Sequence, residues 1–452
     1  MSGNQSNAVL MNSVSTTTAE RSSSACPAVG PSVGELHDVE WVYGASWPTL
    51  RFDALVLDAH LRQSLVTVRS LGRRGRSVAA LHTCSNVPTF ASRWCQRGFV
   101  CPAGYATEAY LAYLEQLLER TGAGVLISSH DGTIELLRQH RSRLEQRVRI
   151  ALAREPAMIT AVNKERTLAV ARRLGIGVPR SLVVSTVSEV PLALKEIGLP
   201  AVVKPTESWL WGEQQGARVT TRLVTTPEEA GRAVADLTRF GGVALFQQLL
   251  SGRREAVSFL YSNGEIYARF AQWAKRTNPP LGGESVLRQS IAAPSDIGDQ
   301  AERLVREIDL EGYSEVEFRR DSVGLPYLME INPRLSASVE IAVRSGVDFP
   351  YLLYQWANGG PIDKVEGYRV GRWMRHLKGD IMTTISTLRQ RGRPGVTPPA
   401  QAVVGFGLSF FRPMGYDYMD WADPLPAVKA TADFTRHAVS RVLRGSTLRR
   451  NS

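Results

Sequence analysis

The chain has 452 residues, a formal net charge of +11 at pH 7 and 43% hydrophobic residues. This length is sufficient for two or three domains, and the hydrophobic content is typical of a soluble globular protein. The 54 lysine and arginine residues are distributed along the chain and do not form one basic block. We therefore interpret the positive charge as affinity for anionic small substrates, and we expect no nucleic-acid partner.

Several common sites are absent from the sequence. No lysine follows a glycine, which excludes a Gly-x-x-x-x-Gly-Lys phosphate loop, and there is no Gly-x-Gly-x-x-Gly dinucleotide fingerprint and no His-Glu-x-x-His zinc motif. The four cysteines form no Cys-x-x-Cys pair, and the N-terminus lacks the basic-then-apolar order of a secretion signal, so we expect a cytoplasmic protein. The apolar run Ala402–Phe411 is too short to span a bilayer. We expect it to be a core or groove segment, without stable membrane insertion.

Residues 1–48 are rich in Ser, Thr, Ala and Gly and lack hydrophobic periodicity, which predicts a disordered tail. From residue 49 to about 150, apolar strands alternate with amphipathic helices. This βαβ pattern predicts a parallel sheet that is covered by helices. The expected strands are Ala54–Leu57, Ser77–Leu81 and Gly124–Ser128, and the expected helices are Leu61–Leu71 and a segment that begins near Gly132.

Two polar residues, His130 and Asp131, follow the last of these strands. Ligands of open α/β sheets bind beyond the carboxyl ends of the strands. An aspartate at the start of a helix can also cap that helix. We interpret Asp131 as a helix cap, and ligand binding is the alternative.

Lysines are informative in this chain because only seven of the 54 basic residues are lysines. Lys164 opens an amphipathic helix, Lys164–Leu174, which Gly175 terminates. Lys204 lies at the end of the apolar strand Leu199–Pro205. An ammonium group at the end of a strand is suited to binding phosphate.

A further apolar strand, Val243–Leu250, runs into a turn at residues 251–252, and Glu255 follows that turn. Upstream of it lies Thr206–Gly216, which contains only two glycines and two tryptophans. We predict that this segment is a mobile lid. Packing of the tryptophans against a neighbouring subdomain is the alternative.

The most specific pattern lies between Ser314 and Ser336. Two runs that alternate polar and apolar residues, Ser314–Phe318 and Tyr327–Asn332, flank a turn signal at Asp321–Pro326. Strand, turn and strand in this order predict a β-hairpin.

Centring the hairpin between residues 323 and 324 places Glu317 opposite Glu330 and Glu315 opposite Asn332. Directly opposed residues share one face of a sheet, so up to three carboxylates and an amide would gather there, and such oxygen ligands suit Mg²⁺. Arg334 follows the second strand with a fixed positive charge. A solvated polar face is the alternative, but the opposed carboxylates would then repel each other without compensation.

This constellation resembles the ATP-grasp superfamily over roughly residues 53–360, and in particular its carboxylate–amine ligase and carbamoyl-phosphate-synthase-like branches. The resemblance implies mixed α/β and α+β architecture. It implies a Rossmann-like domain at residues 49–150, an ATP-grasp domain of two α+β subdomains at 151–362, and an α-rich extension at 363–452. The lid subdomain would cover about residues 178–242.

The resemblance also implies roles for individual residues. Magnesium ions would be bound by Glu317, Glu330 and Asn332. Lys164 and Lys204 would contact the ATP phosphates, and Arg334, with Lys204, would serve the chemistry by holding the acyl phosphate. The adenine hinge and ribose contacts would come from Gln248, Leu249, Leu250 and Glu255. Gln248 replaces the more common glutamate of the family, and the lid has fewer glycines than is usual there.

The implied activity is ATP-dependent formation of an amide from a small-molecule carboxylate and an amine, through an acyl phosphate. Amino acids or small peptides are the expected substrates, ATP with Mg²⁺ or Mn²⁺ the expected cofactors, and a homodimer the expected assembly. One alternative is the phosphorylation of bicarbonate, as in carbamoyl phosphate synthesis. The other is a degenerate ATP-binding regulatory protein, which the atypical lid and Gln248 suggest.

Overall fold

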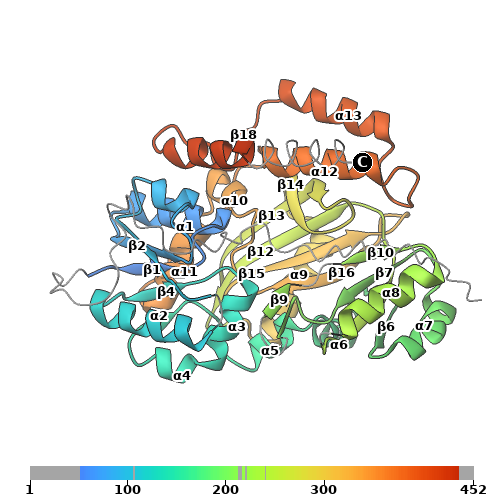
Figure 1. Ribbon diagram of the computed structural model, residues 1–452, viewed down its shortest axis with the longest axis horizontal. Coiled ribbons are helices and arrows are strands. Elements are labelled where there is room, and N and C mark those ends of the chain that lie inside the picture. The colour runs from blue at the N-terminus through green and yellow to red at the C-terminus, as the bar shows by residue number, and fades with distance from the viewer. Residues whose placement is uncertain (1–50, 105–106, 212–215, 219–220, 240, 437–452) are drawn as a thin grey trace, which may run out of the picture. The chain divides into compact units, whose positions relative to one another are not determined.

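The structure is a computed structural model (Figure 1), and it describes residues 51–104, 107–211, 216–218, 221–239 and 241–436. These residues all belong to one compact unit, Val39–Ser452. The predicted disordered tail at residues 1–48 lies outside the described residues. Within the described part of the chain, no helix has the length and apolar content needed to cross a membrane.

The first part of the chain forms a five-stranded parallel sheet in the order β3-β2-β1-β4-β5, as the βαβ pattern predicts. Side chains alternate between two covered faces: Leu55 and Leu57 pack with α2, whereas Ala54 and Val56 pack with α1 and α11. The strands are β1 (Ala54–Val56), β2 (Val78–His82), β3 (Arg97–Val100), β4 (Val125–Ile127) and β5 (Arg149–Ile150). The helices are α1 (Arg62–Arg73), α2 (Glu108–Thr121), α3 (Asp131–Gln139), α4 (Arg141–Leu144) and, from later in the chain, α11 (Phe349–Asn358).

A smaller antiparallel sheet, in the order β10-β7-β11-β6, lies in the region where the lid subdomain is predicted. Val184, Val203 and Phe246 form its core with the helices α7 and α8, which lie together on one face of this sheet (Figure 1). The sheet includes β11, which lies a few residues beyond the predicted boundary at 242. Its elements are β6 (Ser181–Val184), α7 (Val190–Ile197), β7 (Ala201–Pro205), β10 (Arg222–Val224), α8 (Pro227–Thr238) and β11 (Ala244–Gln248). A small two-stranded sheet, β8 (Trp209–Trp211) with β9 (Gly216–Arg218), follows β7.

The largest sheet has seven strands in the order β16-β15-β12-β13-β14-β17-β18. Helices α5 and α6 contact β16, α9 contacts β12 and β15, and α12 contacts β13 and β14. Its strands are β12 (Arg254–Ser262), β13 (Glu265–Asn278), β14 (Glu284–Ile291), β15 (Gly312–Arg320), β16 (Pro326–Asn332), β17 (Trp373–Arg375) and β18 (Gly415–Tyr416). The remaining helices are α5 (Ala157–Val162), α6 (Lys164–Arg173), α9 (Ser295–Glu307), α10 (Glu340–Ser345), α12 (Leu377–Arg389) and α13 (Pro399–Leu408).

The region after residue 363 is not purely helical, because β17 and β18 join the largest sheet. The apolar run Ala402–Phe411 forms α13 and a following 3-10 turn, and it is not the core or groove segment that we expected. Val404 is 58% exposed and Phe411 is 88% exposed, and α13 contains no buried residue. The physical reason is that α12 already covers the sheet, so that α13 packs on α12 and not on the core.

Candidate functional site

The β15–β16 hairpin carries the predicted cluster of oxygen ligands. Its register pairs Glu317 with Glu330 and Glu315 with Asn332, as the sequence predicts. The Asn332 Nδ2 donates a hydrogen bond to Glu317 Oε1 over 3.2 Å, so the amide oxygen of Asn332 is the atom that can bind a cation. On the other face of the hairpin, Ile331 is buried in the core.

The two opposed carboxyl groups have pKa values that differ in direction. Burial raises the pKa of Glu317 to about 7, and the charge of Arg254 only partly offsets this effect. Burial also acts on Glu330, but Lys164 and Lys204 hold the pKa of Glu330 below its usual value. Neighbouring cations therefore keep Glu330 ionised at neutral pH.

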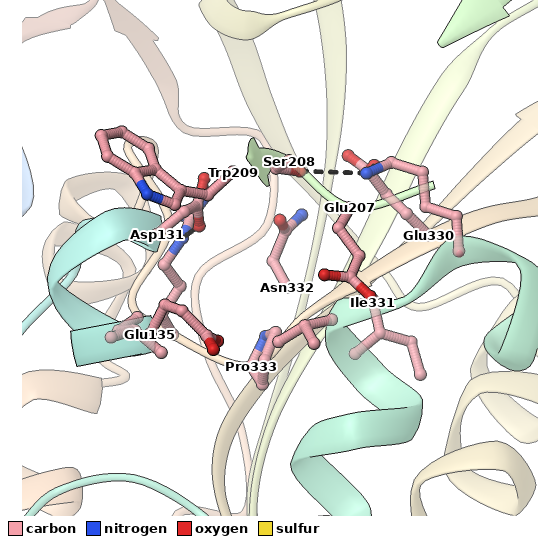
Figure 2. Close-up of a pocket in the computed structure, with 13 residues that line it drawn as sticks. Asp131, Glu135, Glu207, Ser208, Trp209, Glu330, Ile331, Asn332 and Pro333 are labelled. Carbon is pink, nitrogen blue, oxygen red and sulfur yellow. Dashed lines mark hydrogen bonds and ion pairs between the residues drawn. The ribbon is translucent and has the colours of Figure 1, made fainter. Parts of the chain in front are cut away.

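Lys164 is placed by the start of α6. Asn163 caps this helix, because its side chain accepts a hydrogen bond from Arg166 N over 3.0 Å. The ammonium nitrogen of Lys164 donates to Ser208 Oγ over 3.0 Å and lies 3.4 Å from Glu330 Oε2. Figure 2 shows Ser208, Glu330 and other residues around the same pocket.

From β7, the charge of Lys204 also lowers the pKa of Glu330. Its residue is only 5% exposed on β7, and its Nζ lies 3.5 Å from the main-chain oxygen of Met329. Burial lowers the pKa of Lys204 to about 8, although the nearby Glu330 acts in the opposite direction. Lys164 and Lys204, which are 40 residues apart, thus both lower the pKa of Glu330. Their contacts with the ATP phosphates stay a prediction.

Arg334 lies directly after β16 and binds Asp131 at the start of α3. The pair has two contacts: Arg334 Nε donates a hydrogen bond to Asp131 Oδ1, and Arg334 Nη2 lies 3.2 Å from Asp131 Oδ2. The N-cap residue of α3 is His130, and it makes no side-chain cap hydrogen bond. Our interpretation of Asp131 as a helix cap is therefore wrong, because its carboxylate is used by Arg334.

The segment after β7 contacts the start of α3 through Trp209. Its ring lies against Gly132, where an added Cβ would be 2.6 Å from the indole, and its centroid is 5.2 Å from the ring of His130. Glycine at position 132 is what allows this close approach. Trp209 therefore packs against a neighbouring part of the chain, whereas the side chain of Trp211 and residues 212–215 lie outside the described residues.

The predicted nucleotide hinge lies at the end of β11, and its contact with adenine stays a prediction. β11 ends at Gln248, whose main-chain N–H donates to Arg180 O over 2.9 Å, and Leu249 and Leu250 follow it. The carboxylate of Glu255 is 3.0 Å from Arg253 and 2.6 Å from Arg320.

Glu255 and the carboxylate cluster lie on opposite faces of the large sheet. Glu255 pairs with the core residue Phe318, whereas Ala256 pairs with Glu317. Arg254 therefore shares the face of Glu317, and the ribose contact of Glu255 stays a prediction.

Gln247 is a further candidate for nucleotide binding that the sequence pattern did not indicate. It is fully buried, and neither polar atom of its side chain has a hydrogen-bond partner among the described residues. In the sheet, Leu245 pairs with Lys204 and Gln247 pairs with Val202, so Gln247 shares the face of Lys204. Buried amides normally have partners, and the alternation of residues along β11 was the available signal.

A second pocket adjoins this site and is lined by polar side chains from three parts of the chain. Buried Glu315 accepts a hydrogen bond there from Gln272 Nε2 over 2.9 Å, and burial raises the pKa of Glu315. A molecule bound in this second pocket would lie next to the first pocket, which Lys164 lines, because the two pockets share lining residues. The shared residues are Asp131, Glu330, Asn332 and Arg334, and the second pocket also has Gln63, Ser129, His130, Glu284, Ser336 and Ser338.

The segment that follows β18 forms ion pairs with α1, a helix that covers the first sheet. Three aspartates in it bind three arginines of α1 that lie at positions 62, 69 and 73, on one face of that helix. Arg62 also lies 2.6 Å from Glu284, which lines the second pocket. The ion pairs are Arg62–Asp417, Arg69–Asp423 and Arg73–Asp420.

Comparison with known proteins gives matches at the level of a family and of a fold. The family model described as "ATP-grasp in the biosynthetic pathway with Ter operon" matches residues 245–377, a range that includes the whole β15–β16 hairpin. D-alanine--D-alanine ligase B from Pseudomonas putida is 25% identical over 217 residues, which are 44% of this chain and 64% of that protein. The chain thus spans about 64% of the length of this curated relative.

Solved structures resemble the chain over most of its length. The L-amino acid ligase from Bacillus licheniformis has a TM-score of 0.56 and 18% identity, over 72% of this chain and 80% of that one. The biotin carboxylase domain dimer of 2-oxoglutarate carboxylase from Hydrogenobacter thermophilus, in complex with MgADP, ADP and bicarbonate, has a TM-score of 0.56 and 15% identity, over 72% and 73%. At these identities the likeness establishes the fold: a parallel α/β sheet followed by antiparallel α+β sheets.

Proposed function

We propose that this chain, which belongs to the ATP-grasp superfamily, is an ATP-dependent ligase that joins a carboxylate to an amine and releases ADP and phosphate. The observation that carries the proposal is the arrangement of Lys164, Lys204 and Arg334 around the carboxylates of Glu317 and Glu330. Phosphoryl transfer needs positioning and charge neutralisation more than a protein nucleophile. Fixed cations beside paired carboxylates supply the positioning and the charge neutralisation that this chemistry needs.

The reaction has two steps. A carboxylate oxygen of the first substrate forms a bond to the γ-phosphorus of ATP, and the bond from that phosphorus to the ADP oxygen breaks. The amine nitrogen then bonds to the acyl carbon of the acyl phosphate and releases a proton to solvent, and phosphate leaves. In the first step Lys164 and Lys204 hold the transferred phosphoryl group from fixed positions. Arg334 has N–H donors beyond those that Asp131 accepts, and with them it holds the acyl phosphate.

The residues of the hairpin fit a hard divalent cation. Glu317, Glu330 and Asn332 would hold Mg²⁺ or Mn²⁺, because carboxylate and amide oxygens are the donors that such ions select. When bound, the ion would neutralise negative charge on the phosphates. Within the described residues, no group of three or more His, Cys, Asp or Glu side chains is arranged for a metal ion. The amide oxygen of Asn332 would complete the donor set, because the Nδ2 of the same amide is directed to Glu317.

The second pocket supports a small polar substrate, and we propose an amino acid or a short peptide. Arg334 can bind a substrate carboxylate there, and Glu284 and Glu315 can bind an amine. The L-amino acid ligase and the D-alanine ligase among the similar proteins agree with this class. Bicarbonate is the second candidate, because the similar biotin carboxylase domain holds bicarbonate with MgADP. The homodimer and the cytoplasmic location remain predictions.

Trapping the acyl phosphate tests the proposal. The purified chain is incubated with MgATP, pooled amino acids and hydroxylamine, which converts an acyl phosphate into a hydroxamate. We expect hydroxamate from the wild type and none from the Glu330→Gln variant, at equal folded content by circular dichroism. ADP release that depends on bicarbonate, without hydroxamate, would favour the bicarbonate reaction. Tight MgATP binding without turnover over a broad panel would favour a regulatory protein.

A further inference from the structure

Arg254 is a cation within the carboxylate cluster that no sequence pattern indicated. Its Nε lies 2.9 Å and its Nη2 lies 2.5 Å from the same oxygen, Oε2 of Glu317. Its Nη1 donates to the main-chain oxygen of Gly283. The guanidinium group is thus held on one side by β15 and on the other by the turn between β13 and β14.

The turn that receives Arg254 requires glycine. Gly283 has a φ of +74°, and an added Cβ there would collide with the main-chain oxygen of Asn278. Only glycine fits this position, and its carbonyl is the group that accepts from Arg254. The side chain of Arg254 is 17% exposed and that of Glu317 is 9% exposed. This pair is therefore shielded from solvent and is not a mobile surface contact.

Arg254 limits the oxygens that the cluster offers to metal ions. Oε2 of Glu317 is taken by the guanidinium, and Oε1 accepts the hydrogen bond from Asn332. Oε1 of Glu317 keeps a second lone pair, and the Glu330 carboxylate and the amide oxygen of Asn332 also remain, with Lys164 3.4 Å from one of the Glu330 oxygens. These donors, together with phosphate oxygens and water, suffice for one Mg²⁺ ion.

A second divalent ion would need a bridging carboxylate. Two-metal phosphate sites hold their ions roughly 3.5–4 Å apart, and protein carboxylates normally connect them. Glu317, which pairs with Glu330 across the hairpin, is the second carboxylate available beside that residue, but its Oε2 already carries the guanidinium of Arg254 at hydrogen-bond distance. An ion there would face the positive charge of Arg254 at close range.

We infer that Arg254 takes the place of a second divalent cation, so that the site binds one Mg²⁺ or Mn²⁺ ion per nucleotide. This inference rests on the proposed function, because it assumes that the hairpin carboxylates serve a nucleotide. Arg254 is then a positioning residue for the reaction: it fixes Glu317 and supplies permanent positive charge. A practical consequence is that activity should saturate with a single class of divalent-ion site.

Counting bound Mn²⁺ tests the inference without any turnover. The wild type is titrated with Mn²⁺ in the presence of saturating adenylyl imidodiphosphate, a non-hydrolysable ATP analogue. Manganese and nucleotide are measured on both sides of an equilibrium-dialysis membrane, and the excess of each on the protein side is the bound amount. We expect one Mn²⁺ per bound nucleotide in the wild type and two in Arg254→Met, which frees Oε2 of Glu317. Arg253→Met is the matched control and should keep one ion, because Arg253 pairs with Glu255, on the other face of β12.

The outcomes separate this inference from the proposed function. Two Mn²⁺ ions per nucleotide in the wild type would overturn the role of Arg254, whether or not the variants fold. An unchanged single ion in folded Arg254→Met would overturn it as well. Arg254→Lys, which keeps the charge, should also keep one ion. If the wild type bound no nucleotide, the proposed function would fail first and this inference with it.

Discussion

Arg334 and Asp131 form a two-point ion pair between positions that are 203 residues apart in the chain. The pair joins the start of α3 in the first sheet to the end of β16 in the large sheet. Burial lowers the pKa of Arg334, but Asp131 outweighs that effect and the net shift is upward. The orientation of the arginine that we assign to the acyl phosphate thus depends on a carboxylate of the first domain.

Asp131→Asn should therefore lower turnover more than nucleotide binding. The substitution keeps the size of the side chain but removes the charge that orients Arg334. A displacement of about 1 Å in a positioning group can reduce turnover by about 100-fold. The rate of ADP release at saturating substrates and the Kd for the non-hydrolysable ATP analogue measure the two effects. Glu119→Gln, in an exposed pair with Arg147, is the control. Equal losses in both quantities would contradict the assigned role.

The lowered pKa of Lys204 predicts how the use of ATP depends on pH. Its pKa is lowered to about 8, so its positive charge is present below pH 8 and is lost as the pH rises through that value. The kcat/KM for ATP, which reports the free enzyme, should fall above about pH 8.

The matched variant is Lys204→Arg, because a guanidinium stays charged over this range. It should move the fall in kcat/KM to higher pH. Lys195→Arg, at an exposed position of α7, should leave the profile unchanged. A profile of Lys204→Arg identical to that of the wild type would show that another group titrates.

The ion pair between Arg69 and Asp423 predicts a large effect on stability. Both side chains are 1% exposed and 2.9 Å apart, and Asp423 also accepts from Ser92 Oγ over 2.7 Å. Asp423→Ala should lower the free energy of unfolding by about 3–5 kcal/mol, because it leaves Arg69 buried without its partner. Urea unfolding measures the change. Glu119→Ala should cost less than about 1 kcal/mol, and a similarly small cost at Asp423 would refute the prediction.

The local part of the site could be predicted from the sequence. Alternation of side chains predicted that Glu317 and Glu330 share one face. The turn alone did not determine their register, because Phe318 pairs with Leu328 next to the turn and an irregularity between Glu317 and Phe318 brings Glu317 opposite Glu330. Lys164 was located by the start of its helix, and Arg334 by the end of its strand. These features depend on neighbours within about ten residues, which a single sequence contains.

Long-range partners could not be predicted in the same way. Asp131 was assigned to a helix cap because its partner Arg334 is remote in the chain. Arg254 and Glu255 are adjacent, and the sequence pattern gave no reason to place Arg254, and not Glu255, on the face of Glu317. The exposure of α13 likewise depends on α12, which covers the sheet first. Tertiary packing determines these long-range partners and exposures, and the composition of the chain does not reveal that packing.

Phosphate release from MgATP, measured with pooled amino acids in the presence and absence of bicarbonate, tests the central claim most directly. The wild type is compared with Glu330→Gln at equal folded content. We predict release that requires the amino acids, does not require bicarbonate, and is lost in Glu330→Gln, together with an amide product of matching amount. Release that persists in the folded variant would contradict the site, and release that depends on bicarbonate alone would contradict the ligase.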